Sequence, residues 1–245
     1  MLAYLRLQDE LRAWRSAGRR AILWWRDDDA RGPSERLLRL LEISDLGQVP
    51  LSLAVIPDQG VKALPPLLSE RPWVSLIQHG VDHRNRRDGS CAGEFPASAS
   101  DAVMQTLLCQ SGSVLEGLPG RLAVFAPPWN DVHPRLLPVL QSCGYRGLSA
   151  WGQIHEPGGA RLDVHLDLLR WRGGARFRGR ARFWAALAHE LAVRRKNSLW
   201  RAPIGLLTHH LSHEERAWRF LESFVNWSRN RPEFIWEKLG HLLAA

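Results

Sequence analysis

The chain has 245 residues, of which 45% are hydrophobic, and a formal net charge of +8 at pH 7. We expect one domain over residues 1–245, with its core at about residues 20–228. No apolar run approaches the roughly 20 residues of a membrane span, and the N-terminal segment alternates leucine with charged residues instead of forming a signal-peptide core. These features exclude a membrane-spanning protein and lead us to expect a cytoplasmic one.

Short apolar runs alternate along the chain with longer amphipathic segments. The candidate strands are residues 21–25, 50–56, 74–78, 122–126, 147–149, 164–169 and 203–207. The candidate helices are residues 34–46, a stretch from residue 61, and residues 100–115, 134–143, 182–195 and 213–227. This alternation predicts a mostly parallel α/β sheet, and seven such units favour a closed or nearly closed β/α barrel. Functional residues should then lie at the C-terminal ends of the strands.

Three adjacent carboxylates, Asp27, Asp28 and Asp29, follow the first candidate strand. They repel one another and are costly to remove from water unless a cation lies nearby. A bound metal ion would resolve this conflict. The alternative is a solvated acidic turn or the start of a helix.

Two histidines, His79 and His83, follow the third candidate strand. If this segment is helical, imidazoles four residues apart project to the same side and can share one metal ion. The zinc-protease pattern needs glutamate after the first histidine, but Gly80 stands there, so a protease is excluded. A chance pair on a helix surface is the alternative.

Two further clusters follow later candidate strands. Residues 127–130 read Pro-Pro-Trp-Asn, a stiff segment that can form a pocket wall or a rigid turn with a core tryptophan. His209 and His210 follow the last candidate strand, where a histidine can serve as general acid. Neighbours on an extended chain point to opposite sides, so we expect only one of these two histidines to face the site.

These four clusters, in this order, resemble the motifs of the polysaccharide deacetylase superfamily (carbohydrate esterase family 4), over about residues 23–210. The resemblance implies a single-domain distorted (β/α)7-type barrel. It also implies a metal-dependent hydrolase that removes an N-acetyl group, or a related acyl amide, from a sugar or similar small substrate. One divalent metal ion is implied; Zn²⁺ is expected, with iron, cobalt, nickel and manganese as alternatives.

The resemblance also assigns roles to individual residues. Asp28 corresponds to the catalytic base and Asp29 to a metal ligand, with Asp27 as the rival base if the register slips by one residue. His79 and His83 correspond to the other two metal ligands. Residues 207–209 match the Leu-x-His motif, which makes His209 the general acid and His210 the alternative. The expected substrate-binding residues are Pro128, Trp129, Asn130 and Trp171.

The sequence departs from the family pattern at two positions. Ala126 stands where the family has the arginine that accompanies the base, and Arg170 stands where it has an aspartate that tunes the catalytic histidine. We expect Arg26 or Arg170 to pair with Asp28 in place of the missing arginine.

The same reasoning applies to the catalytic histidine. We expect Asp163 or Asp167 to orient His209, because the family's aspartate is replaced. The two departures also leave open a catalytically degenerate protein that keeps only the fold and the metal.

A third alternative is a basic polyanion-binding module. It rests on an arginine-dense segment that contains Arg170, Arg172, Arg176, Arg178, Arg180 and Arg182. No known nucleic-acid-binding motif accompanies these arginines, and a solvated loop that closes over the site is the simpler interpretation. We therefore expect a small-molecule or carbohydrate substrate and no nucleic acid. The sequence carries no signal about the oligomeric state.

Overall fold

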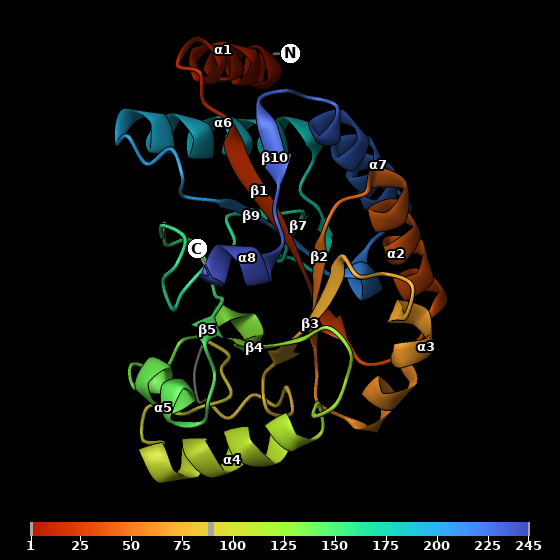
Figure 1. The fold of residues 1–245 in the computed structure, drawn as a ribbon, viewed down its shortest axis with the longest axis vertical. Coiled ribbons are helices and arrows are strands. Elements are labelled where there is room, and N and C mark those ends of the chain that lie inside the picture. Colours follow the sequence, from red (N-terminus) through yellow and green to blue (C-terminus); the bar gives the residue numbers. More distant parts are fainter. Residues whose placement is uncertain (1, 88–90, 245) are drawn as a thin grey trace.

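The computed structural model describes residues 2–87 and 91–244 (Figure 1). Within these ranges, parallel strands form a sheet in the order β5-β4-β3-β2-β1-β9-β6, and β10 pairs with the beginning of β1. The strands are β1 Ala21–Ala30, β2 Leu51–Val55, β3 Val74–His79, β4 Arg121–Ala126, β5 Gly147–Leu148, β6 Leu166–Asp167, β9 Ile204–Thr208 and β10 Phe234–Trp236. A separate antiparallel hairpin consists of β7 Leu169–Arg170 and β8 Arg176–Phe177.

The sheet curls so that its two edges, β5 and β6, approach each other. The chain before β6 forms parallel bridges with the chain in and after β5, at Leu148 with Arg161 and at Trp151 with Val164. The predicted distorted (β/α)7-type barrel is therefore confirmed, with its closure made by single bridges instead of a full ladder.

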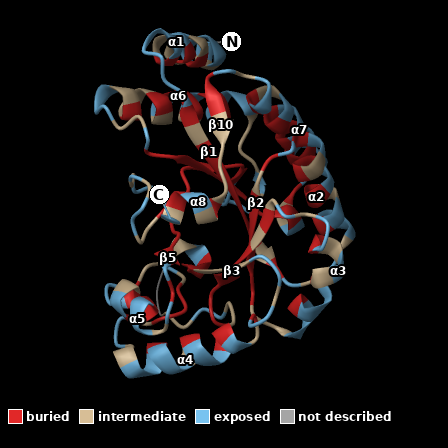
Figure 2. Ribbon diagram, in the orientation of Figure 1, coloured by how far each residue is buried: buried red, intermediate tan, exposed pale blue. Residues whose placement is uncertain are grey.

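Helices cover the outside of the barrel (Figure 1). They are α1 Leu2–Ser16, α2 Glu35–Gly47, α3 Pro65–Leu68, α4 Asp101–Ser113, α5 Leu136–Ser142, α6 Arg180–Lys196, α7 Glu215–Arg229 and α8 Leu239–Ala244. Short 3₁₀ turns lie at η1 Gln59–Ala63, η2 Pro128–Asn130 and η3 His210–Ser212. The central strands of the sheet are buried, whereas the helices are exposed on their outer faces (Figure 2). None of the helices described is both long and apolar enough to cross a bilayer.

Alternation along β1 divides its side chains between two cores. Leu23 and Trp25 pack into the outer core beneath the helices, whereas Trp24 packs into the barrel interior. Successive side chains on a strand point to opposite faces, so Asp28 lies on the same side as Trp24 and Asp27 on the side of Trp25. Both faces of β1 are covered, which explains why its first half is continuously apolar.

All seven candidate strands are present, and the 164–169 run divides into β6 and β7. Besides the short strand β8, three elements were missed: α1, β10 and α8. The charged residues between the leucines of α1 obscured its helical pattern, and β10 is only three residues long. These elements lie outside residues 20–228, yet Trp14 of α1 and Phe234 of β10 belong to the outer core.

Trp14 tests whether α1 is an integral part of the fold. Its ring is fully buried, packs edge-on against Trp200 at 4.9 Å, and donates from Nε1 to the carbonyl oxygen of Leu191 on α6 at 3.2 Å. Trp14→Ala should lower the free energy of unfolding by about 3–5 kcal/mol, measured by urea denaturation. Leu5→Ala, on the exposed side of α1, should change it by less than about 0.5 kcal/mol. Equal, small losses in both variants would show that α1 does not dock in solution.

Candidate metal centre and active site

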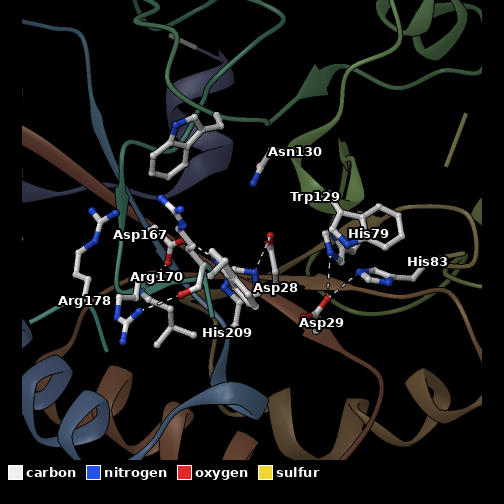
Figure 3. Close-up of a pocket in the computed structure, with 14 residues that line it drawn as sticks. Asp28, Asp29, His79, His83, Trp129, Asn130, Asp167, Arg170, Arg178 and His209 are labelled. Atoms are coloured by element: carbon white, nitrogen blue, oxygen red, sulfur yellow. Dashed lines mark hydrogen bonds and ion pairs between the residues drawn. The ribbon is translucent and has the colours of Figure 1, made fainter. Parts of the chain in front are cut away.

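One pocket opens at the C-terminal ends of the barrel strands, where the polar clusters of the sequence meet (Figure 3). Its volume is about 860 Å³, within the usual range for sites that bind small molecules. Among its lining residues are Asp28, Asp29, His79, His83 and His209. The two acids end β1, His79 ends β3, and His209 directly follows β9. Residues separated by up to 181 positions in the sequence therefore share one cavity.

Asp29, His79 and His83 bring three metal-binding atoms together (Figure 3). The Nε2 atoms of His79 and His83 lie 3.3 and 3.1 Å from Oδ1 of Asp29, and the three donor atoms are all within 4.8 Å of one another. Although burial by itself raises the pKa of Asp29, hydrogen bonds to the two histidines hold it well below its usual range. The carboxylate is therefore ionised and available as a ligand.

The orientation of the His79 ring fits a metal ligand. Its Nδ1 lies 3.0 Å from the carbonyl oxygen of Ala126, so Nδ1 carries the hydrogen and donates it. Nε2 is then the ring nitrogen that faces Asp29, so it would be the atom that binds a metal, as in metal-bound histidines whose ring is fixed by a backbone carbonyl. Ala126 contributes here through its backbone carbonyl. Its methyl side chain therefore offered no indication of this contact in the sequence.

The segment that carries His83 is a loop and not the helical turn that the histidine spacing suggested. The carboxylate of Glu94 accepts the backbone N–H groups of Val81 at 2.8 Å, Asp82 at 3.0 Å and His83 at 2.5 Å. Gly80 has φ +70°, and a Cβ there would lie 2.5 Å from the Glu94 carboxylate. A buried carboxylate thus shapes the loop, and sequence reasoning missed it because Glu94 lies outside every cluster.

A bulge in β1 brings two consecutive carboxylates to the pocket. The pairing of β1 with β2 shifts register between Asp27 and Ala30, and Asp29 has a left-handed φ of 73°. Without the bulge, strict alternation would turn Asp29 away from Asp28. Of the acidic triplet, Asp28 and Asp29 line the pocket and Asp27 does not.

Asp27 and His210, the alternative base and acid, contact each other away from the pocket. Asp27 is fully buried and accepts hydrogen bonds from the Thr208 hydroxyl at 2.6 Å, the His210 backbone N–H at 3.0 Å, and His210 Nδ1. Burial alone raises the pKa of Asp27, but the contacts with His210 outweigh it and lower the pKa. Asp27 lies on the outward face of β1, and His210 follows β9 on the corresponding outward side. Alternation along the two strands therefore explains why neither residue is among those that line the pocket.

Arg26 is the arginine that lies beside Asp28. Its side chain is 0% exposed; Nε lies 2.8 Å from Oδ1 of Asp28, and Nη2 donates to Oδ2 at 2.9 Å. Nη2 also donates to Oδ1 of Asn130 at 2.7 Å, and Nη1 donates to the carbonyl oxygen of Ser149 at 2.7 Å. The expected contact with Asp28 is therefore present for Arg26. Arg170 is exposed and instead donates to the backbone of a neighbouring arginine.

The expected contact between His209 and an orienting carboxylate is absent among the described residues. Nδ1 of His209 is buried without a hydrogen-bond partner. Asp163 forms an ion pair with Arg161, and Asp167 accepts a hydrogen bond from Nε1 of Trp171 at 2.8 Å. The Trp171 ring packs edge-on against His209 at 4.6 Å. Asp167 therefore holds the indole of Trp171, and that indole contacts His209.

Aromatic side chains form much of the remaining pocket wall. Trp129, Trp151 and Trp171 line it and are 44%, 41% and 48% exposed. Trp129 packs against His83 at 4.7 Å, whereas Pro128, which we expected to bind substrate, is buried and is not among the residues that line the pocket. Sequence reasoning missed Trp151, because it follows a two-residue strand and no motif surrounds it.

Solved structures share this fold, although no family model and no curated protein matches the sequence. A Mycobacterium smegmatis protein provisionally named a polysaccharide deacetylase superposes with a TM-score of 0.65 at 16% identity, over 92% of this chain and 90% of that chain. A family 4 carbohydrate esterase from Streptomyces lividans, in complex with acetate, gives 0.53 at 14% identity, over 84% and 87%. A family 4 pseudoenzyme from Bacillus anthracis gives 0.53 at 14%, over 85% and 61%. The chain therefore has the polysaccharide deacetylase fold.

Glu94 offers a test of how the loop shapes the metal centre. Glu94→Ala removes the carboxylate that accepts the backbone N–H groups of Val81, Asp82 and His83, so the His83 ligand should lose its orientation. We expect zinc affinity to fall by about 10–100-fold, measured by competition with a fluorescent chelator. Asp82→Asn on the same loop changes a carboxylate whose contacts are with Arg84 and Arg86, and it should leave the affinity unchanged. Unaltered affinity in Glu94→Ala would contradict this role.

Proposed function

We propose that the protein is a metal-dependent amidohydrolase that removes an N-acyl group, most simply acetyl, from a sugar or related small substrate. The observation that carries this proposal is that one pocket contains both the Asp29–His79–His83 donor set and the carboxylate of Asp28. Asp28 is buried, pairs with Arg26 and is not a member of the donor set. A binding module has no need for a second, arginine-held carboxylate beside a metal site.

Asp29, His79 and His83 would hold the metal. Two imidazoles and one carboxylate suit Zn²⁺, and iron, cobalt, nickel or manganese are compatible with the same donors. Three protein ligands leave coordination positions open, which is typical of catalytic sites. When bound, the metal would supply Lewis acidity, which polarises the acyl carbonyl and activates water.

Asp28 would act as the general base. Arg26 contacts both of its carboxylate oxygens, so the carboxylate is kept ionised and held in one orientation. It is 2% exposed, which keeps competing water away from the oxygen that accepts the proton. Asn130 and Ser149 hold Arg26 in turn, so the base is positioned by three separate segments of the chain.

His209 would act as the general acid that protonates the leaving amine. Its Nε2 lies 3.8 Å from Oδ2 of Asp28, so the proton donor and the proton acceptor flank the same volume. Trp171 limits the rotation of the imidazole ring from one side. A sugar ring could stack on the exposed faces of Trp129 and Trp171 while its acyl group lies at the Asp29–His79–His83 donor set, beside Asp28 and His209.

A catalytically degenerate protein is the second candidate. The observation that favours it is the unpartnered Nδ1 of His209, because a catalytic histidine is usually oriented by a hydrogen bond at that atom. One protein with this fold is itself described as a pseudoenzyme. Such a protein would bind the metal and release no acetate.

Metal content tests the first part of the proposal. The purified wild-type protein should contain one equivalent of zinc or another divalent metal per chain, measured by plasma mass spectrometry. His79→Ala should lose it, because two donors bind far more weakly than three. His189→Ala, which changes an exposed histidine on α6, should retain it. Equal metal content in all three proteins would show that the donor set is not the metal site.

Asp28→Asn tests the second part. The amide cannot accept the proton, so kcat for acetate release from N-acetylated sugars should fall by about 10²–10⁴-fold. Metal content should remain at the wild-type value, because Asp28 is not in the donor set. Asp58→Asn, an equivalent change at a surface pair with Arg31, should leave kcat unaltered. A wild-type protein that holds its metal but releases acetate from no N-acetylated sugar would favour the degenerate alternative.

A further inference from the structure

The pocket has a second wall whose chemistry the metal centre does not use. This second wall, the arginine wall, is lined by Arg170, Arg172 and Arg178. Arg170 lies on β7, Arg172 lies in the segment between β7 and β8, and Arg178 directly follows β8. Arg170 and Arg178 extend from the side of the pocket opposite Asp29, His79 and His83, with Asp28 and His209 between the two groups (Figure 3).

These three arginines lack carboxylate partners. Throughout the described chain, no ion pair joins an acidic side chain to Arg170, Arg172 or Arg178, and the one side-chain hydrogen bond among them runs from Arg170 to the backbone of Arg172. By contrast, the fully buried Arg26 contacts both oxygens of Asp28. The guanidinium groups on the hairpin are therefore available to a ligand.

The charge on this wall favours a doubly charged ligand. Asp167 is the one carboxylate among the described pocket residues on this side, and its oxygens already accept from the Leu169 backbone N–H and from Nε1 of Trp171, both at 2.8 Å. Three guanidinium groups against one occupied carboxylate leave an excess of about two positive charges. A phosphate monoester carries nearly two negative charges at pH 7 and presents several acceptor oxygens to arginine.

We propose that the substrate is a phosphorylated N-acyl sugar, whose phosphate is bound by Arg170, Arg172 and Arg178 while its acyl group lies at the Asp29–His79–His83 donor set. This inference rests on the proposed function for the acyl end and on the hairpin for the phosphate end. The exposed rings of Trp151 and Trp171 line the same cavity and offer apolar faces to the sugar between the two ends.

The first experiment measures phosphate binding without catalysis. In the full-length His79→Ala background, which removes one metal ligand, inorganic phosphate and the 1- and 6-phosphates of N-acetylglucosamine are titrated by calorimetry. Adding Arg170→Gln, Arg172→Gln and Arg178→Gln together should weaken phosphate binding by at least about tenfold. Adding Arg176→Gln instead, on the same hairpin but outside the pocket lining, should change it by less than about twofold.

The second experiment measures specificity in the metal-loaded protein. We expect kcat/KM for at least one of the two phosphorylated sugars to exceed that for N-acetylglucosamine by at least about tenfold. The triple arginine variant should remove this preference through a higher KM for the phosphorylated sugar, whereas Arg176→Gln should keep it.

The outcomes separate this inference from the proposed function. Arginine-dependent binding of phosphate without any acetate release would support the arginine wall and overturn the hydrolase. Acetate release with no preference for phosphorylated sugars would support the hydrolase and overturn the arginine wall. Phosphate binding that the triple variant leaves unaltered would also overturn the proposed role of the arginine wall. Arginine-dependent binding of a single-stranded oligonucleotide, by a protein that binds neither sugar phosphate, would overturn that role too.

Discussion

The buried pair of Arg26 and Asp28 is the interaction on which the pocket depends. A guanidinium group with no exposed surface is costly to remove from water, and it persists here because Asp28, Asn130 and Ser149 engage its donors. These contacts join β1 to the η2 turn and to the chain after β5. The residue that holds the proposed base therefore also ties three walls of the pocket together, and loss of either charge would leave the other one buried and uncompensated.

The metal-ligand geometry depends on backbone distortions around this pair. The β1 bulge gives Asp29 its positive φ and brings it beside Asp28, and Glu94 holds the loop that gives His83 its positive φ. Left-handed conformations of residues other than glycine are strained, and they persist where surrounding contacts over-determine them. Their concentration at one end of the barrel is typical of a functional site.

The pocket differs from the motif pattern in how it supports its polar groups. The arginine beside Asp28 comes from the same strand as the acid, and the carbonyl of Ala126 serves His79 where the family pattern has an arginine side chain. Around His209, an indole held by Asp167 stands in place of a direct carboxylate contact. Arg170, which breaks the motif at that point, joins the arginine wall instead.

Local sequence pattern was enough to indicate the alternation of strands and helices and the polar residues at the strand ends, because hydrophobic period and strand-end position are local properties. Alternation from Trp24 onward also separates Asp28 from Asp27. Strict alternation would place Asp29 on the opposite side from Asp28, and the bulge that brings both into the pocket depends on pairing with β2. The tertiary structure likewise decided the roles of Glu94, Trp151 and the arginine wall, since these arise from contacts between distant segments that no local pattern encodes.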